Sequence, residues 1–234
     1  MFWKNEADAR ELGCVREASR KRKLRKLIMA SSPQYLNGVI VLAGGTGERL
    51  GGRSKPNLLI AGDRLISWTL SFLPPVPTVV VAPEEVEVPE KVFLTMEEPP
   101  GSGPAAGIVA GWHRLAASFV FSPSDIIGVC PVDAPLSGFA LRQLARQLQE
   151  TNEEAVEKEK ILLGQVGEVT QYVLGAFTVR ALMEMARANP LNRSVRGVLG
   201  EIGFTTREIS PDYAHDVDTP ADIPPVTELL RISR

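Results

Sequence analysis

The residues best suited to chemistry lie in a glycine-rich stretch that follows the first apolar run of the chain. Five of the nine residues in 44–52 are glycine, and they come directly after the run 38–42. Glycine lets backbone N–H groups approach a polyphosphate closely and allows positive φ angles. Arg49 and Lys55 place positive charge in the same stretch, where phosphate charge would lie. The stretch therefore predicts a phosphate-binding loop.

Two common phosphate-binding motifs do not fit this stretch. A P-loop has Lys directly after its second glycine, whereas Arg53 follows Gly52 here. A dinucleotide fingerprint has a third glycine where this chain has Leu50. A plain glycine-rich turn with incidental basic neighbours remains the structural alternative.

A carboxylate, Asp133, stands where another apolar run, 126–130, comes to its end. In open α/β sheets, ligands bind beyond the carboxyl ends of the strands. Mg²⁺ takes oxygen ligands and is usually held by one or two carboxylates together with phosphates and water. Asp133 is therefore a candidate magnesium ligand, and the alternative is an ordinary turn or helix-capping aspartate.

The elements that must position these residues alternate along the chain. Short apolar, often β-branched runs predict strands at 38–42, 78–82, 92–94, 126–130 and 161–163. Helices are predicted at 66–73, 104–117, 178–188 and 194–202, and after caps at Ser137 and Thr219. The charged stretch 152–160 either extends a helix or forms a surface loop. The alternation predicts an α/β fold with a doubly wound, mostly parallel sheet in a Rossmann-like three-layer sandwich.

Charge is distributed unevenly. Residues 1–30 hold nine Lys and Arg against four Asp and Glu, although the whole chain of 234 residues has a formal charge of -2. We expect a basic, poorly ordered N-terminal extension over 1–33 and a globular domain over 34–234. The basic cluster 20–26 could bind nucleic acid or a membrane surface, but a solvated terminal segment is the favoured interpretation.

The totals limit the class of protein. Hydrophobic residues make up 44% of the chain and charged residues 23%, which is typical of a globular domain. Without a global basic charge we expect no nucleic-acid partner. No apolar run approaches the roughly 20 residues of a membrane helix, and the N-terminus does not resemble a secretory signal. Cys14 and Cys130 lack metal-type spacing. We therefore expect a cytoplasmic protein without a membrane partner.

Together with later motifs, the glycine stretch resembles the molybdenum cofactor guanylyltransferase family, which belongs to the NTP-transferase domains. The family signature is close to L-A-G-G-x-x-x-R-M/L-G-G-x-D-K. The segments 42–45 and 49–52 and Lys55 match it, while Ser54 stands where the family often has Asp. The resemblance implies that the nucleotide phosphates are bound by Leu42, Ala43, Gly44, Gly45 and Lys55, with Arg49 assisting.

Three later motifs extend the resemblance. The segment 103–107 resembles the family's G-P-L-A-G element, which implies that Gly103 contacts the nucleotide. Glu98 stands near the family's nucleotide-contacting Asp, although an exposed loop carboxylate is an equal alternative. Asp133 matches the family's metal-binding D-x-P element. The segment 215–222 resembles N-x-N/D-T-P-E-D-L and implies that Asp218 helps to hold the metal; simple capping of the last helix is the alternative.

The resemblance implies a Mg²⁺-dependent enzyme that transfers GMP from GTP to molybdopterin, the molybdenum cofactor, and releases pyrophosphate. Arg49, Lys55 and Asp133 would be its catalytic residues, and molybdoenzymes or cofactor-biosynthesis proteins its possible partners. Other NTP transferases share this chemistry: molybdopterin cytidylyltransferase, 2-phospholactate guanylyltransferase and sugar-phosphate nucleotidyltransferases. A non-catalytic nucleotide-binding or cofactor-handover protein is a further alternative, and the Leu50 mismatch argues against a Rossmann oxidoreductase.

The acceptor region is the least specific part of the resemblance. Asn192, Arg193 and Arg196 could meet an anionic acceptor. A solvated helix start is the favoured interpretation of these three residues.

Overall fold

A computed structural model describes residues 35–44, 54–154 and 158–233. The predicted N-terminal extension 1–33 lies outside these ranges. The part from Tyr35 onward forms one compact unit, and none of its described helices is both long and apolar enough to cross a bilayer.

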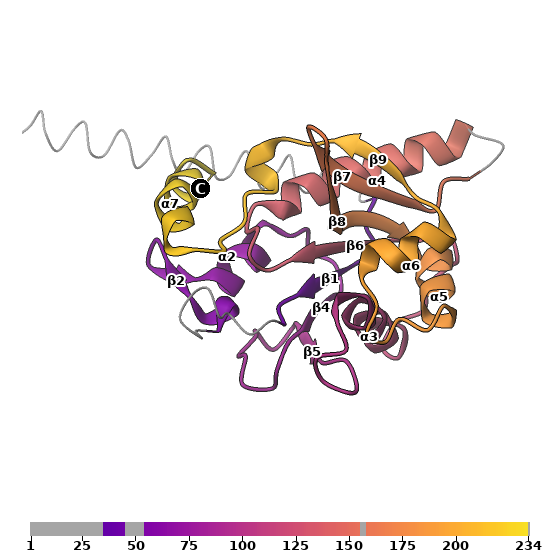
Figure 1. Ribbon diagram of the computed structural model, residues 1–234, viewed down its shortest axis with the longest axis horizontal. Helices are drawn as coiled ribbons and strands as arrows, with labels where there is room; N and C mark the ends of the chain where they lie inside the picture. Colours follow the sequence, from indigo (N-terminus) through magenta and orange to yellow (C-terminus); the bar gives the residue numbers. More distant parts are fainter. Residues whose placement is uncertain (1–34, 45–53, 155–157, 234) are drawn as a thin grey trace, which may run out of the picture. The chain divides into compact units, whose positions relative to one another are not determined.

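A seven-stranded sheet with the order β5-β4-β1-β6-β8-β7-β9 forms the centre of this unit (Figure 1). Its strands are β1 (Gly38–Leu42), β4 (Thr78–Val81), β5 (Phe93–Thr95), β6 (Ile126–Pro131), β7 (Ile161–Val166), β8 (Val169–Thr178) and β9 (Thr205–Glu208). β8 runs antiparallel to both of its neighbours, and the other neighbouring pairs are parallel. The predicted mostly parallel sheet is confirmed.

Helices cover both faces of the sheet. One face carries α3 (Pro104–Ala116), α5 (Val179–Arg187) and α6 (Val195–Ile202). The other face carries α4 (Ser137–Glu154), with α2 (Leu65–Phe72) beside it. Each face has its own buried apolar cluster, because strands buried on both sides are apolar on both sides. This is the predicted three-layer sandwich.

A smaller apolar cluster joins α2 to α7 (Ile223–Ser233), the last helix. Short elements complete the fold near the carboxyl ends of the strands: η2 (Lys55–Asn57), β2 (Leu59–Ile60), β3 (Asp63–Arg64), η3 (Pro211–Tyr213) and η4 (Pro220–Asp222).

The five predicted strands and six predicted helices are present. The cap predicted at Ser137 is not formed, because α4 begins at Ser137 itself and its buried hydroxyl has no hydrogen-bond partner within the described residues. Two other helices are capped. The Thr178 hydroxyl accepts a hydrogen bond from the Ala181 N–H, and the Ser194 hydroxyl accepts one from the Gly197 N–H. The 152–160 stretch begins as helix, since α4 reaches Glu154. β8 and β9 were not predicted: β9 is polar and only partly buried, so it has no apolar run to reveal it.

Three strand ends are tied together where the site would lie. The Ala43 N–H donates a hydrogen bond to the Val81 carbonyl at 2.8 Å, and the Val132 N–H donates one to the Leu42 carbonyl at 2.9 Å. The ends of β1, β4 and β6 therefore form one fixed edge, and the residues that follow them are held close to one another.

Candidate functional site

Lys55 joins two aspartates that are far away in sequence. Its Nζ lies 2.7 Å from Oδ2 of Asp133 and 2.5 Å from Oδ1 of Asp218. The side chains of Lys55 and Asp133 are 20% and 21% exposed, so solvent screens this pair only partly. The three residues that were predicted from separate motifs therefore meet at a single point.

Asp133 is positioned by backbone bonds from several elements. It follows β6, and Val132, the residue between β6 and Asp133, is hydrogen-bonded to β1. The Thr69 hydroxyl on α2 donates to the Val132 carbonyl at 2.8 Å. The Val217 N–H donates to the Asp133 carbonyl at 3.0 Å, which places the segment 216–218 directly beside Asp133.

Asp218 is positioned by a capping box at the start of η4. Oδ2 of Asp222 accepts hydrogen bonds from the Asp218 N–H at 3.1 Å and from the Thr219 N–H at 2.6 Å. The predicted role of Asp218 at a metal stays a prediction, but helix capping and a contact with Lys55 are both present. They involve different residues, because Asp222 fixes the loop while the Asp218 carboxylate is turned to Lys55.

The charges at this point act on one another. Burial lowers the pKa of Lys55, but its hydrogen bonds to Asp133 and Asp218 outweigh that effect and leave the pKa above its ordinary value. Partial burial raises the pKa of Asp216, and the neighbouring charges of Asp133 and Asp218 raise it further. A lysine that stays protonated beside an excess of carboxylate charge can bind phosphate when a further cation neutralises that excess.

Some of the predicted nucleotide-binding residues lie in the described part of the chain, and others lie outside it. Leu42, Ala43 and Gly44 lie at the carboxyl end of β1, and Gly44 is exposed there. Gly45 and Arg49 lie outside the described residues, and their roles stay predictions. Gly103 is the residue that precedes α3 and has a φ of 91°, which favours glycine.

Of two neighbouring glutamates, Glu97 faces the strand ends. Its Oε1 accepts a hydrogen bond from the Gly101 N–H at 3.1 Å. Its Oε2 lies 3.7 Å from where a Cβ on Gly107 would stand, beside Leu42. Glu98 is exposed, and its contact with the nucleotide stays a prediction. Sequence reasoning missed Glu97 because adjacent glutamates in a loop give no signal of which one turns inward.

Cys130 does not contribute a nucleophile. It lies in β6 three residues before Asp133 and is fully buried. Burial raises the pKa of its thiol to about 12, so the reactive thiolate is absent at neutral pH. The expectation of a small apolar residue in a buried strand is confirmed.

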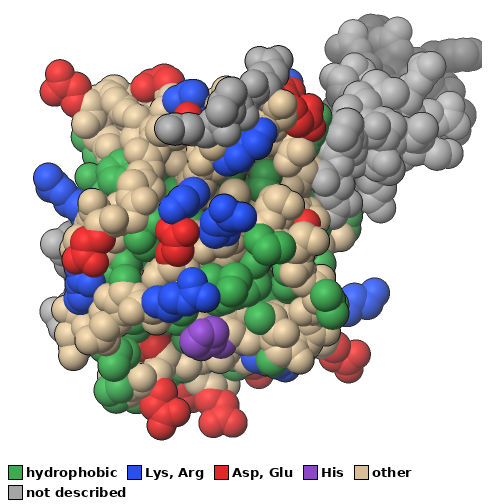
Figure 2. Space-filling model, turned by 90° about the vertical axis from the view of Figure 1, so that its right-hand side faces the viewer, with side chains coloured by type: hydrophobic (Ala, Val, Ile, Leu, Met, Phe, Trp, Pro, Cys, Tyr) green, Lys and Arg blue, Asp and Glu red, His purple; other side chains and the backbone are tan. Residues whose placement is uncertain are grey.

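A groove of about 710 Å³ runs along the outer side of α3. Met96, Val109 and Leu191 are among the apolar residues that line it, and His113 and Arg187 among the basic ones. Figure 2 shows the face of the molecule on the right of Figure 1, where Lys and Arg side chains lie beside hydrophobic surface. The groove does not include Lys55 or the aspartates.

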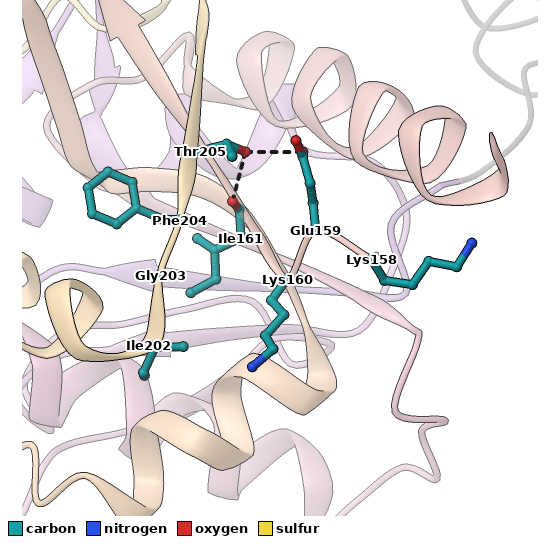
Figure 3. A pocket seen from close by; sticks show the side chains of 8 residues that line it. All are labelled: Lys158, Glu159, Lys160, Ile161, Ile202, Gly203, Phe204 and Thr205. Carbon is teal, nitrogen blue, oxygen red and sulfur yellow. Dashed lines mark hydrogen bonds between the residues drawn. The ribbon is translucent and has the colours of Figure 1, made fainter. Parts of the chain in front are cut away.

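A smaller hollow of about 200 Å³ opens at the amino ends of β7 and β9 (Figure 3). This is the opposite end of the sheet from Lys55, Asp133 and Asp218, which together form the lysine site. The polar groups of the hollow satisfy one another: the Thr205 hydroxyl bonds to Glu159 and to the Ile161 carbonyl, and Lys160 pairs with Glu184 at 2.7 Å. This hollow has no part in the lysine site.

Comparison with known proteins gives a relationship over most of the chain. Residues 39–203 match the family model described as the MobA-like NTP transferase domain. A molybdenum cofactor guanylyltransferase from Vibrio cholerae is 30% identical over 152 residues, which cover 63% of this chain and 68% of that protein. One from Cereibacter sphaeroides is 32% identical over 101 residues, covering 41% of this chain and 49% of that protein.

Solved structures agree on the fold. Molybdopterin-guanine dinucleotide biosynthesis protein A from Archaeoglobus fulgidus aligns with a TM-score of 0.63 at 21% identity, over 83% of this chain and 99% of that one. The 2-C-methyl-D-erythritol 4-phosphate cytidylyltransferase from Thermus thermophilus aligns at 0.57 and 17%, over 84% and 99%. With its sheet, its lysine between two aspartates and this match over more than half of its length, the chain belongs to the MobA-like NTP transferase family.

Proposed function

We propose that this chain transfers GMP from GTP to molybdopterin, or to its molybdenum-loaded form, in a Mg²⁺-dependent reaction in the cytoplasm. The observation that carries the proposal is the meeting of Lys55 with Asp133 and Asp218 at the end of β6. The names of the relatives support guanine as the base and the molybdenum cofactor as the acceptor.

In this reaction a phosphate oxygen of the acceptor attacks the α-phosphorus of GTP. The new O–P bond forms as the bond to the β-phosphate bridging oxygen breaks, and pyrophosphate leaves with that electron pair. The acceptor phosphate is already anionic, so no protein nucleophile is needed. The chain's contribution is to position the two substrates and to neutralise charge.

Each described residue then has a defined task. Lys55 stays protonated because its pKa is raised, and it would share its N–H donors between the aspartates and the nucleotide phosphates. Backbone N–H groups after β1 would hold the same phosphates. Glu97, beside Leu42, would accept hydrogen bonds from the nucleoside end, because an ionised carboxylate has no donor of its own.

The residues present fit a magnesium ion. Asp133 and Asp218 offer hard carboxylate oxygens within 2.7 Å of one shared point, the Lys55 Nζ. Among the described residues no group of three or more His, Cys, Asp or Glu could hold a metal alone, so phosphate and water oxygens would complete the coordination. When bound, magnesium would neutralise charge on the phosphates. Asp133 and Asp218 would hold the ion and keep Lys55 in place.

The direct test is a pyrophosphate-release assay with each NTP in turn, Mg²⁺ and purified molybdopterin. We expect turnover with GTP, none with the other nucleotides, and loss of turnover when EDTA removes the metal. Turnover with CTP alone would refute guanine specificity and indicate a cytidylyltransferase. GTP turnover only with 2-phospholactate or with a sugar phosphate would refute the proposed acceptor.

A further inference from the structure

Three polar residues near the start of α6 could meet the acceptor, and the structure separates them. Arg193 donates hydrogen bonds to the carbonyls of Ala188 and Gly197 and pairs with Glu201. It therefore serves the loop itself. The backbone N–H of Asn192 donates to the Ser102 carbonyl at 2.8 Å, which ties the loop to the start of α3, and the Asn192 side chain is exposed but carries no charge.

Arg196 differs from both. It is exposed, and no described carboxylate forms an ion pair with it. Its guanidinium carbon lies 5.9 Å from the centre of the Tyr172 ring, within the range of a cation–π contact. Its charge is therefore available to a ligand, while the ring below restricts the orientations of the side chain.

A bulge in β8 brings Tyr172 under Arg196. Leu163 of β7 pairs with Gly175, but the next residue, Gly164, pairs with Gln171, so residues 172–174 are extra on β8. Tyr172 and Val173 consequently both pack towards the α6 face, although consecutive residues of a regular strand face opposite sides. Bulges next to functional sites commonly redirect a side chain in this way. The ring is further supported by Phe204, whose centroid is 5.8 Å away, edge to face.

The pair stands at the same edge of the sheet as the lysine site. β6 and β8 pair Val129 with Gly175. Because these strands are antiparallel, the chain from Gly175 back to Tyr172 runs towards the carboxyl end of β6, which Asp133 follows. The start of α6 is fixed at this edge too, because the Asn192 contact ties it to Ser102 at the start of α3. Arg196 thus lies over β8, the strand that neighbours β6 on the side away from β1.

We propose that Arg196, held over Tyr172, is the residue on which the flat heterocyclic end of the acceptor stacks. The inference rests on the proposed transfer reaction, in which the reacting phosphate must lie at Lys55 and Asp133. The group that extends towards β8 is then the far end of the acceptor, which in molybdopterin is a pterin whose pyrimidine ring is planar. A guanidinium offers such a ring both a planar face and N–H donors, which an ammonium group does not.

The kinetic test compares R196A, R196K, Y172L and Y172F with wild type in the pyrophosphate assay. For R196A, R196K and Y172L we expect the acceptor KM to rise about tenfold, equivalent to about 1.4 kcal/mol, with an unchanged KM for GTP. Y172F keeps the ring and should behave like wild type. R146A, an exposed arginine that pairs with Glu150 on α4, is the matched control. The proposal would be refuted if R196A leaves the acceptor KM unchanged, or raises the KM for GTP as much as the KM for the acceptor. A wild-type acceptor KM in R196K would show that charge alone suffices and would refute stacking.

A binding test stands apart from the transfer reaction. The fluorescence anisotropy of free pterin is titrated with wild-type protein, R196A and R146A. We expect about tenfold weaker binding to R196A only. If wild type binds pterin in this way but transfers no GMP to molybdopterin, the proposed function fails and the stacking site stands. If wild type and R196A bind pterin equally, or neither binds it, the stacking site fails whatever the enzyme transfers.

Discussion

Replacing Asp133 by Asn removes one charge from the site and changes little else. The amide has the shape of the carboxylate, and its oxygen can still accept a hydrogen bond from Lys55. The backbone carbonyl of residue 133 keeps its bond to the Val217 N–H. Lys55 keeps its second partner, Asp218, at 2.5 Å. The substitution therefore separates the charge at this position from the structure around it.

The expected sizes of the two effects differ. The Lys55–Asp133 pair is about one-fifth exposed at both side chains. Because solvent partly screens the pair and Lys55 keeps its second partner, losing the pair should cost about 1 kcal/mol of stability or less. For a domain of this size that lowers Tm by about 2–4 °C. Removing one fixed electrostatic group from an active site typically lowers kcat by about 10²–10³-fold. Loss of the proposed magnesium ligand should place D133N at or beyond that range.

Thermal melting and pyrophosphate release, measured on the same preparation, test this reasoning. We expect a near-native melting curve and turnover below about one-hundredth of wild type, in line with the expected kcat loss. Turnover above one-tenth of wild type would refute the role of Asp133 at the metal. A collapse of Tm that accounts for the lost activity would show that the carboxylate acts through the fold instead.

Three further predictions concern positioning, packing and titration. D222A should lower turnover about 10–100-fold, as the loss of groups that orient a ligand does, because Asp222 holds the Asp218 and Thr219 N–H groups; the pyrophosphate assay measures this. G138A should destabilise the domain by about 1–3 kcal/mol in urea unfolding, since its Cβ would lie 2.4 Å from the Phe72 carbonyl oxygen. Stability should also fall as pH rises from 9.0 towards about 12, because the buried Cys130 thiol stays protonated when folded but ionises when unfolded; C130A should reduce this slope in urea unfolding.

Each of these has its own control. D212A removes an exposed aspartate in η3 and should leave turnover unchanged; equal losses in D212A and D222A would contradict positioning by Asp222. Gly200 lies inside α6 with no atom near its would-be Cβ, so G200A should gain roughly 0.5–1 kcal/mol, and a loss as large as that of G138A would contradict the packing argument. A C130A slope equal to wild type would assign the alkaline loss to other groups.

Sequence alone determined the architecture and singled out Lys55, Asp133 and Asp218 as candidate site residues. The β-branched run 38–42 predicted a buried strand, because its apolar residues and the glycines that end it are features of the local sequence. Asp133 could be assigned to a strand end for the same reason, and Lys55 and Asp218 followed from motif resemblance. Local signals also marked the helix starts at Thr178 and Ser194, whose hydroxyls cap the first turn.

Tertiary structure alone decided which of several similar residues face the site. Glu97 rather than Glu98 turns to β1. Arg193 bonds to groups of its own loop and to Glu201, while Arg196 is exposed. The bulge that redirects Tyr172 exists only in the pairing of β8 with β7. Lys55 meets Asp133 and Asp218 although they are 78 and 163 residues away from it in the sequence, respectively. Such choices depend on contacts between distant segments, and the chemical type of a residue does not specify which distant segment it will meet.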